Sequence, residues 1–280
     1  MRWVSFESAG RASYGVVVGD GVVDVGARHS HRTLKDLLAS GDFETVGREA
    51  ARAKADVALA EIRYLPVIPN PDKILCAGVN YKAHMEETGR EATAQPTIFT
   101  RFAASQVGHG RPMLRPHESK RLDYEGEIAL VIGKPCRRVK ATEALRHVAG
   151  FAPYNDGSVR DFQRHTTQFT PGKNFVATGG FGPWMMTPDE IGDLDEMEVV
   201  TRLNGQEMQR AKAKLLIFGF AELIAYCSVF TELVPGDVIV TGTPGGVGMA
   251  RTPPVFMDAG DVVEVEVKPI GTLRNPIEVG

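Results

Sequence analysis

The chain has 280 residues, of which 43 % are hydrophobic and 24 % are charged, and its formal net charge is -3. These are ordinary values for a globular protein with a substantial core, and they favour neither a nucleic-acid partner nor a membrane-surface partner. The three cysteines are widely separated and form no CxxC pair, which argues against a disulfide framework and against a zinc site. No window approaches about 18 uninterrupted apolar residues, and the N-terminus lacks the apolar segment of a secretory signal, so we expect a cytoplasmic protein.

Residues 1–66 are predicted to form a small α+β domain. Its expected elements are strands over residues 2–6 and 14–18 and helices over residues 33–38 and 43–58. Three prolines within residues 65–72 indicate an extended connection, and we place a domain boundary there. The remaining residues, 67–280, are expected to form a larger and strand-rich domain.

A possible acid–base pair follows the first strand of the larger domain. After an apolar strand over residues 73–79, residues 81–89 favour a helix that stops at Gly89. On such a helix His84 and Glu87 share one face, and a carboxylate beside an imidazole raises its basicity, as a general base requires. The same spacing is also common on ordinary polar helix surfaces, and Glu86 is the neighbouring carboxylate expected to face solvent.

Three carboxylates at alternate positions precede the most apolar strand. Residues 128–132 predict a buried strand, and Asp123, Glu125 and Glu127 come just before it. In an extended chain these side chains point to the same face, where like charges repel one another. A divalent cation such as Mg²⁺ would relieve this repulsion, because it prefers carboxylate oxygens. The alternative is a solvated acidic ladder at the end of a strand.

A second group of polar residues follows the expected turn from a strand into a helix near Asp156. Arg160 and Gln163 would lie on the same helix face as Asp156, and together they could hold a metal and an anionic substrate. A helix cap with an i,i+4 ion pair explains the same spacing equally well. Lys173 follows a glycine and lies two residues before Phe175, where it could bind a carboxylate or simply lie at the surface.

The C-terminal third is expected to contain a hairpin with its turn at Asn204–Gly205 and a core-packed helix over residues 209–233. A strand over residues 238–241 runs into a glycine-rich loop, residues 242–248, whose backbone N–H groups could cradle an anion. A further alternating strand is expected over residues 261–268. The predicted fold class is therefore α+β and strand-rich.

The order and spacing of these motifs resemble the fumarylacetoacetate hydrolase superfamily, in its branch of acylpyruvate hydrolases and oxaloacetate decarboxylases. The resemblance covers roughly residues 70–275, and it implies a mixed β-roll catalytic domain, a small N-terminal domain and a homodimer. It is carried by Asn80-Tyr81-x-x-His84-x-x-Glu87, Asp123-Tyr124-Glu125-x-Glu127, Asn155-Asp156-x-Ser158-x-Arg160-Asp161-x-Gln163, Gly172-Lys173 and Pro235-Gly236-Asp237-x-Ile239-x-Thr241-Gly242-Thr243-Pro244.

Carried over to this sequence, the resemblance implies roles for nine residues. The implied Mg²⁺ or Mn²⁺ ligands are Glu125, Glu127 and Asp156; the implied catalytic residues are His84, Glu87 and Lys173; the implied substrate-binding residues are Arg160, Gln163 and Thr243. Lys173 also matches a position that holds substrate oxygens. Arg101 departs from the family, which usually has lysine at this position, and Asp123 matches no ligand position.

The activity that the resemblance implies is hydrolysis of a C–C bond in a small 2,4-dioxo acid, such as an acylpyruvate or fumarylpyruvate, through a metal-bound enolate. Decarboxylation of oxaloacetate and keto–enol isomerisation of a 2-hydroxymuconate-type acid are the alternatives, because both begin at the same metal site. A more remote alternative is an oxo-acid binding protein without catalysis. We prefer the hydrolase, with a small 2-oxo acid as substrate.

Overall fold

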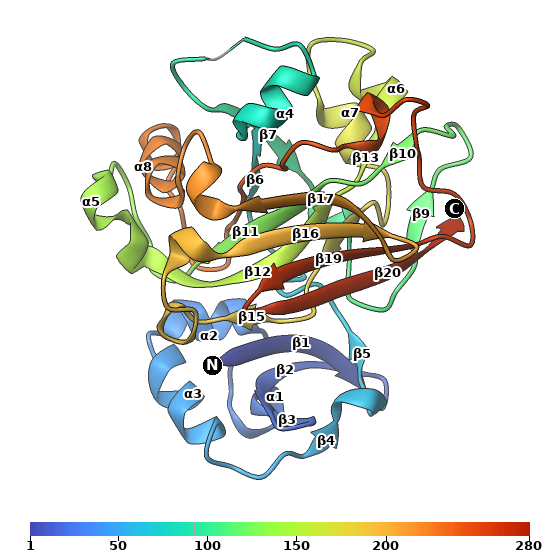
Figure 1. The fold of residues 1–280 in the computed structure, drawn as a ribbon. Coiled ribbons are helices and arrows are strands. Elements are labelled where there is room, and N and C mark those ends of the chain that lie inside the picture. The colour runs from blue at the N-terminus through green and yellow to red at the C-terminus, as the bar shows by residue number, and fades with distance from the viewer. Residues whose placement is uncertain (92) are drawn as a thin grey trace.

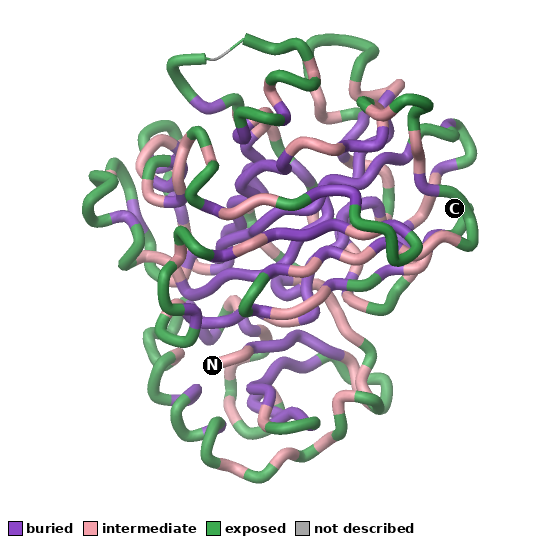
Figure 2. The backbone as a smooth tube through the Cα atoms, in the orientation of Figure 1, coloured by how far each residue is buried: buried purple, intermediate pink, exposed green. Residues whose placement is uncertain are grey.

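The computed structural model describes residues 1–91 and 93–280. The fold is α+β and strand-rich, as the sequence predicts, with the N-terminal part below the strands of the larger part in Figure 1. Buried residues are concentrated in the central strands, whereas the helices and loops at the periphery are mostly exposed (Figure 2).

The largest sheet has thirteen strands and runs through both parts of the chain. Its strands are β1 (Arg2–Ser8), β2 (Arg11–Val18), β3 (Gly21–Asp24), β4 (Val57–Ala58), β5 (Arg63–Tyr64), β6 (Ile74–Gly78), β7 (Thr97–Arg101), β8 (Gln106–Val107), β11 (Gly126–Ile132), β12 (Val148–Asp156), β14 (Gly179–Phe181), β15 (Met185–Met186) and β18 (Val238–Val240). The main path is β4-β3-β2-β1-β15-β12-β11-β18-β6-β7. The sheet is mixed, because β18 pairs with β6 and β14 pairs with β8 in parallel, whereas the other pairs are antiparallel.

A second sheet of five strands packs against the first. In the order β17-β16-β19-β20-β9, its strands are β17 (Gln206–Lys212), β16 (Glu198–Leu203), β19 (Val262–Lys268), β20 (Gly271–Val279) and β9 (Met113–Arg115). Residues alternate between buried and more exposed along β19, and Val265 and Val267 join Ile128 and Leu130 of β11 in one hydrophobic cluster. The predicted hairpin turn lies between β16 and β17, where Asn204 and Gly205 have positive φ angles of 51° and 79°.

The helices are short and lie around the sheets. They are α1 (Val25–Arg28), α2 (Leu34–Ser40), α3 (Phe43–Ala50), α4 (Lys82–Glu87), α5 (Ala141–Ala144), α6 (Arg160–Gln163), α7 (Thr170–Lys173) and α8 (Phe220–Phe230). Among the described residues, no helix has the length and apolar character needed to cross a membrane.

Two predicted helices are shorter in the structure than the sequence suggests. The helix expected over residues 43–58 ends at Ala50, and residues 57–58 form an edge strand instead. The helix expected over residues 209–233 begins only at Phe220, because residues 209–212 belong to β17 and pair with β16. Strand pairing has overridden the local helix propensity of these residues.

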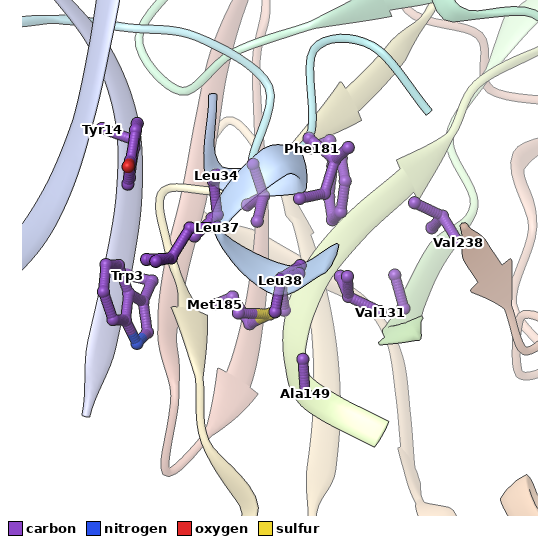
Figure 3. Close-up of a cluster of buried hydrophobic side chains, with 14 of the residues drawn as sticks. Trp3, Tyr14, Leu34, Leu37, Leu38, Val131, Ala149, Phe181, Met185 and Val238 are labelled. Carbon is purple, nitrogen blue, oxygen red and sulfur yellow. The ribbon is translucent and has the colours of Figure 1, made fainter. Parts of the chain in front are cut away.

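The N-terminal part shares both a sheet and a core with the rest of the chain. Strand β1 pairs with β15, and side chains of α2 such as Leu37 and Leu38 pack in the same cluster as Val131 and Val238 (Figure 3). The division at residue 66 and the expected homodimer remain predictions.

Candidate active site

Three carboxylates meet where β11 begins and β12 ends. Glu125 immediately precedes β11, Glu127 is its second residue, and Asp156 is the last residue of β12. Because the two strands are antiparallel, with Gly126 opposite Asn155, these side chains come together. One oxygen from each carboxylate lies within 4.8 Å of the others, and all three residues are buried. The sequence-predicted trio is therefore assembled in space.

Lys173 and Arg160 compensate part of this negative charge. Lys173 Nζ lies 2.6 Å from Glu125 Oε2 and 2.6 Å from Asp156 Oδ2, and Arg160 Nη1 lies 2.6 Å from Glu125 Oε1. Burial alone would raise the pKa of Glu125, but Lys173 and Arg160 lower it to about 2. Burial alone would lower the pKa of Lys173, but Asp156 and Glu125 raise it above its ordinary value. Lys173 is consequently a positively charged ammonium group at neutral pH.

Glu127 is the carboxylate whose charge is least compensated. Among the described residues its side chain accepts a hydrogen bond from the backbone N–H of Gly242 and forms no ion pair. Burial raises its pKa well above 4.5, and the nearby charges of Asp156 and Glu125 raise it further. All three possible metal ligands are carboxylates, which hard divalent cations prefer. Such a cation would relieve the repulsion between Glu127 and the charges of Asp156 and Glu125. The residues therefore fit a Mg²⁺ or Mn²⁺ ion.

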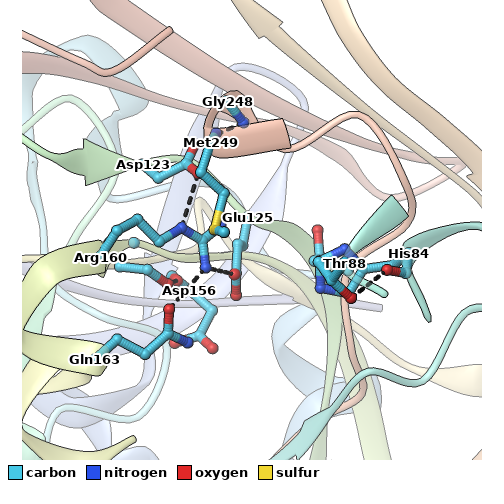
Figure 4. Close-up of polar contacts among 12 residues, drawn as sticks. His84, Thr88, Asp123, Glu125, Asp156, Arg160, Gln163, Gly248 and Met249 are labelled. Carbon is cyan, nitrogen blue, oxygen red and sulfur yellow. Dashed lines mark hydrogen bonds and ion pairs between the residues drawn. The ribbon is translucent and has the colours of Figure 1, made fainter. Parts of the chain in front are cut away.

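Arg160 is held so that part of its guanidinium group remains available. Its Nε donates to Asp123 Oδ2 at 2.8 Å, and its Nη1 donates to Glu125 and to Gln163 Oε1 at 3.0 Å (Figure 4). The third nitrogen, Nη2, is buried and has no hydrogen-bond partner among the described residues. Because a buried donor without a partner is costly, this nitrogen is suited to receive an oxygen of a bound ligand.

The predicted dyad forms on α4. His84 Nδ1 lies 2.8 Å from Glu87 Oε1, and both residues belong to the same helix face. Glu87 Oε2 also accepts a hydrogen bond of 2.8 Å from the backbone N–H of Gly246. With Nδ1 engaged, the Nε2 of His84 is left to act on a ligand. Glu86 is exposed and lies 3.8 Å from Lys82, as expected for a surface carboxylate.

The glycine-rich loop after β18 binds the protein's own carboxylates. Its backbone N–H groups donate from Gly242 to Glu127, from Gly246 to Glu87, and from Gly248 and Met249 to Asp123. The anions that this loop cradles are thus side chains of the site. Through these contacts one segment holds Glu127 of the carboxylate trio, Glu87 of the dyad, and Asp123, which pairs with Arg160.

Two residues at the site carry contacts that the sequence did not predict. Arg101 is fully buried, and it donates to Asp156 Oδ1 at 2.5 Å and to Thr178 Oγ1 at 2.9 Å. Gln209 donates to Thr243 Oγ1 at 2.7 Å and accepts from the N–H of Gly126 at 3.0 Å. The only signal for Arg101 in the sequence is its place at a position where the family usually has lysine, and the sequence predicts a helix at Gln209.

A single cavity connects the predicted residues. Its walls include His84, Glu125, Glu127, Arg160, Gln163, Lys173 and Thr243. Asp156 and Glu87 lie behind this wall, where they contact Lys173 and His84 respectively. The aromatic side chains of Phe99 and Phe169 form an apolar part of the wall.

Residues 73–278 match the family model described as the fumarylacetoacetate (FAA) hydrolase C-terminal domain. The chain belongs to the fumarylacetoacetate hydrolase family. The match spans the carboxylate trio, the dyad and the glycine-rich loop, and it confirms the family resemblance seen in the sequence. It also accounts for the mixed, strand-rich architecture, which is the β-roll of this family.

Relatives and solved structures of this family resemble the chain over more than three quarters of its length. Oxaloacetate tautomerase FAHD2A, a mitochondrial protein of Bos taurus, is 37% identical over 265 residues, covering 92% of this chain and 84% of that protein. Oxaloacetate tautomerase YisK of Bacillus subtilis is 40% identical over 225 residues, covering 79% and 74%. Fumarylacetoacetate hydrolase from Exiguobacterium antarcticum is 32% identical, with a TM-score of 0.85 and full coverage of both chains.

These comparisons place the chain in the acylpyruvate and oxaloacetate branch of the fumarylacetoacetate hydrolase superfamily, whose members are enzymes. One relative is named as mitochondrial and another is bacterial, so the cytoplasmic location expected from the sequence stays a prediction.

Proposed function

We propose that the protein catalyses the keto–enol tautomerisation of a small 2-oxo acid of the oxaloacetate type, with a divalent cation held by Glu125, Glu127 and Asp156. The observation that carries this proposal is the buried carboxylate trio in the same cavity as the His84–Glu87 dyad. A bound Mg²⁺ or Mn²⁺ would act as a Lewis acid that stabilises negative charge on the 2-oxo oxygen. The two relatives named as oxaloacetate tautomerases lead us to prefer this reaction over the hydrolysis favoured by the sequence alone.

The protein's own residues can bind and orient the substrate. Arg160 Nη2 is a buried donor with no partner in the part of the chain that the structure describes, and it is suited to the 1-carboxylate. Thr243 lines the cavity with its hydroxyl fixed by Gln209, and Gln163 lies beside Arg160. Lys173, kept protonated by Asp156 and Glu125, places a positive charge next to the developing enolate.

The dyad supplies the proton transfer. His84 Nε2 would remove a proton from C3 of the keto form and return it in the reverse direction, while Glu87 holds the ring and stabilises the imidazolium. Glu87 is itself held by the N–H of Gly246, so the orientation of the imidazole is set by two elements. Removal of the C3 proton and protonation of the 2-oxo oxygen together convert the keto form into the enol.

Hydrolysis of a C–C bond in an acylpyruvate is the second candidate. The observation that favours it is the same dyad, because His84 can equally remove a proton from a water molecule that attacks the distal carbonyl. The resemblance of the whole chain to a solved fumarylacetoacetate hydrolase supports this candidate as well. Decarboxylation of oxaloacetate would use the same residues.

One substrate panel distinguishes the three reactions. Purified protein with Mg²⁺ is mixed with oxaloacetate, acetylpyruvate and fumarylpyruvate, and the enol absorbance and released pyruvate are followed separately. We expect faster loss of the enol of oxaloacetate without pyruvate, and no acceleration when Mg²⁺ is removed by a chelator. Pyruvate from oxaloacetate would indicate the decarboxylase, and pyruvate from an acylpyruvate alone would indicate the hydrolase.

A further inference from the structure

Two arginines line the cavity outside the carboxylate trio. Arg90 follows α4 and Arg164 follows α6, and both are exposed at the cavity wall. Within residues 1–91 and 93–280, neither forms an ion pair with a carboxylate. The guanidinium carbon of Arg90 lies 5.0 Å from the ring centroid of Phe169, and Arg164 Nη2 lies 3.8 Å from Met249 Sδ. Both side chains therefore retain their capacity to bind an anion.

The charge of the buried floor indicates how many substrate carboxylates it can neutralise. The floor holds three cations and four carboxylates, which are Arg101, Arg160 and Lys173 against Asp123, Glu125, Glu127 and Asp156. With all four carboxylates ionised the net charge of the floor is -1, and a divalent cation would make it +1. One substrate carboxylate then neutralises the charge of the floor. The positive charges of Arg90 and Arg164 are not neutralised by it.

The cavity has an apolar section as well as these two charged regions. Phe99 and Phe169 line it and pack edge to face, with their ring centroids 5.5 Å apart. Phe169 also supports Arg90 through the cation–π contact, which favours a guanidinium held at that wall. A carbon chain can lie against the rings with a charged group at each end.

We infer that Arg90 and Arg164 bind the distal carboxylate of a 2-oxo dicarboxylate, and that they select dicarboxylates over monocarboxylates of equal length. This inference rests on the proposed function for the orientation of the substrate. A guanidinium group presents two parallel N–H donors that match a carboxylate, whereas a neutral chain end gains nothing from it. Both arginines are specificity-determining residues, and neither takes part in proton transfer.

The test is a pair of binding measurements that need no turnover. The Mg²⁺-loaded protein is titrated calorimetrically with 2-oxoglutarate and with 2-oxopentanoate, which differ only in the second carboxylate. We expect wild type to bind the dicarboxylate about 10-fold or more tightly than the monocarboxylate. In Arg90→Ala and Arg164→Ala the affinity for 2-oxoglutarate should fall by about 10-fold, with the affinity for 2-oxopentanoate unchanged.

The matched control is Arg121→Ala, which removes an exposed arginine that does not line the cavity and forms no ion pair among the described residues. It should leave both affinities unchanged. Equal affinity of wild type for the two acids, or an equal loss for both acids in the arginine variants, would overturn the inference. Selective binding of the dicarboxylate without any turnover of oxaloacetate would contradict the proposed function. The inference that Arg90 and Arg164 select dicarboxylates would still hold in that case.

Discussion

The guanidinium group of Arg101 holds the carboxylate of Asp156 from the side opposite Lys173. Its Nη1 lies 2.5 Å from Asp156 Oδ1, whereas Lys173 Nζ lies 2.6 Å from Oδ2. Arg101 is anchored in turn by Thr178 Oγ1 at 2.9 Å and by Ser105 Oγ at 3.2 Å. Asp156 therefore has a fixed orientation before any cation binds, and partners of this kind tune the affinity of a metal site.

Replacing Arg101 by lysine should weaken metal binding. An ammonium group keeps the charge but cannot contact Asp156, Thr178 and Ser105 with one rigid plane. We expect Arg101→Lys to lower the Mg²⁺ affinity by about 10- to 100-fold, measured by isothermal titration calorimetry. An unchanged affinity would show that the orientation of Asp156 does not depend on the guanidinium group.

The effect of Mg²⁺ on stability should grow with pH. Burial, Asp156 and Glu125 raise the pKa of Glu127 well above 4.5, so the folded protein without metal holds a proton that the unfolded chain releases. The free energy of unfolding of the metal-free protein therefore falls as the pH rises above about 4.5, until Glu127 has lost its proton. A bound cation removes this penalty, so the increase in Tm caused by Mg²⁺ should be larger at about pH 8 than at about pH 5.

Glu127→Gln is the control for this pH dependence, because a neutral amide of the same shape cannot be deprotonated. In that variant the metal-free Tm should be higher than in wild type at high pH, and Mg²⁺ should have little effect on it. A Mg²⁺ effect that is independent of pH in wild type would contradict the assignment to Glu127.

Loss of the dyad should reduce turnover with little effect on substrate binding. We expect His84→Ala to lower kcat by about 10²- to 10⁴-fold, because general-base catalysis is typically worth that much, and Glu87→Gln to lower it less. The matched control is Glu86→Gln, next to Glu87 on the same helix. The side chain of Glu86 is exposed and should be dispensable. A His84→Ala variant with wild-type kcat would show that His84 is not the base.

Asp123 should matter for stability more than for metal binding. It accepts hydrogen bonds from Arg160 Nε at 2.8 Å and from the N–H groups of Gly248 and Met249 at 2.8 and 2.9 Å. Asp123→Ala would remove one of the two carboxylates that pair with the buried Arg160 and would leave two backbone donors without this partner, at a cost of about 3–5 kcal/mol in the free energy of unfolding. The comparison is Asp72→Ala, which removes the more exposed ion pair with Lys35 and should cost about 1 kcal/mol or less.

Denaturant unfolding of the two aspartate variants checks this difference. The KM of Asp123→Ala should also rise, since Arg160 loses the contact that fixes its side chain. Equal destabilisation by the two substitutions would show that the buried position of Asp123 adds nothing to its contribution.

Residues at the site that lie in short local motifs could be predicted from the sequence. Glu125 and Glu127 are two apart next to an apolar strand, and His84 and Glu87 are three apart on a helix, so local geometry places each pair correctly. Joining these pairs to Asp156 required the family resemblance, because the pairing of β11 with β12 is not visible in local periodicity.

Contacts between distant segments were missed for the same reason. The alternate spacing predicts that Asp123 shares a face with Glu125 and Glu127. In the structure the chain is not in a strand at Tyr124 and Glu125, and Asp123 lies in the short strand β10 (Leu122–Asp123), which pairs with β13 (Ser158–Val159). Arg101 and Asp156 are 55 positions apart, and no pattern in the sequence joins them.

Gln209 shows how tertiary structure overrides local preference. The stretch from Gln209 to Lys212 consists of good helix formers, yet it forms a strand because its backbone pairs with β16. That strand brings the amide of Gln209 to Thr243 and to the backbone N–H of Gly126. A residue that positions a predicted substrate contact was therefore hidden by the assignment to a helix.

A calorimetric titration with Mg²⁺ tests the central claim most directly. The metal-free wild-type protein should bind one ion per chain, Glu127→Gln should lose about 100-fold or more of the affinity, and Glu86→Gln should bind like wild type. An absence of Mg²⁺ and Mn²⁺ binding in wild type, or an unchanged affinity in Glu127→Gln, would contradict the assignment of Glu125, Glu127 and Asp156 as a metal site.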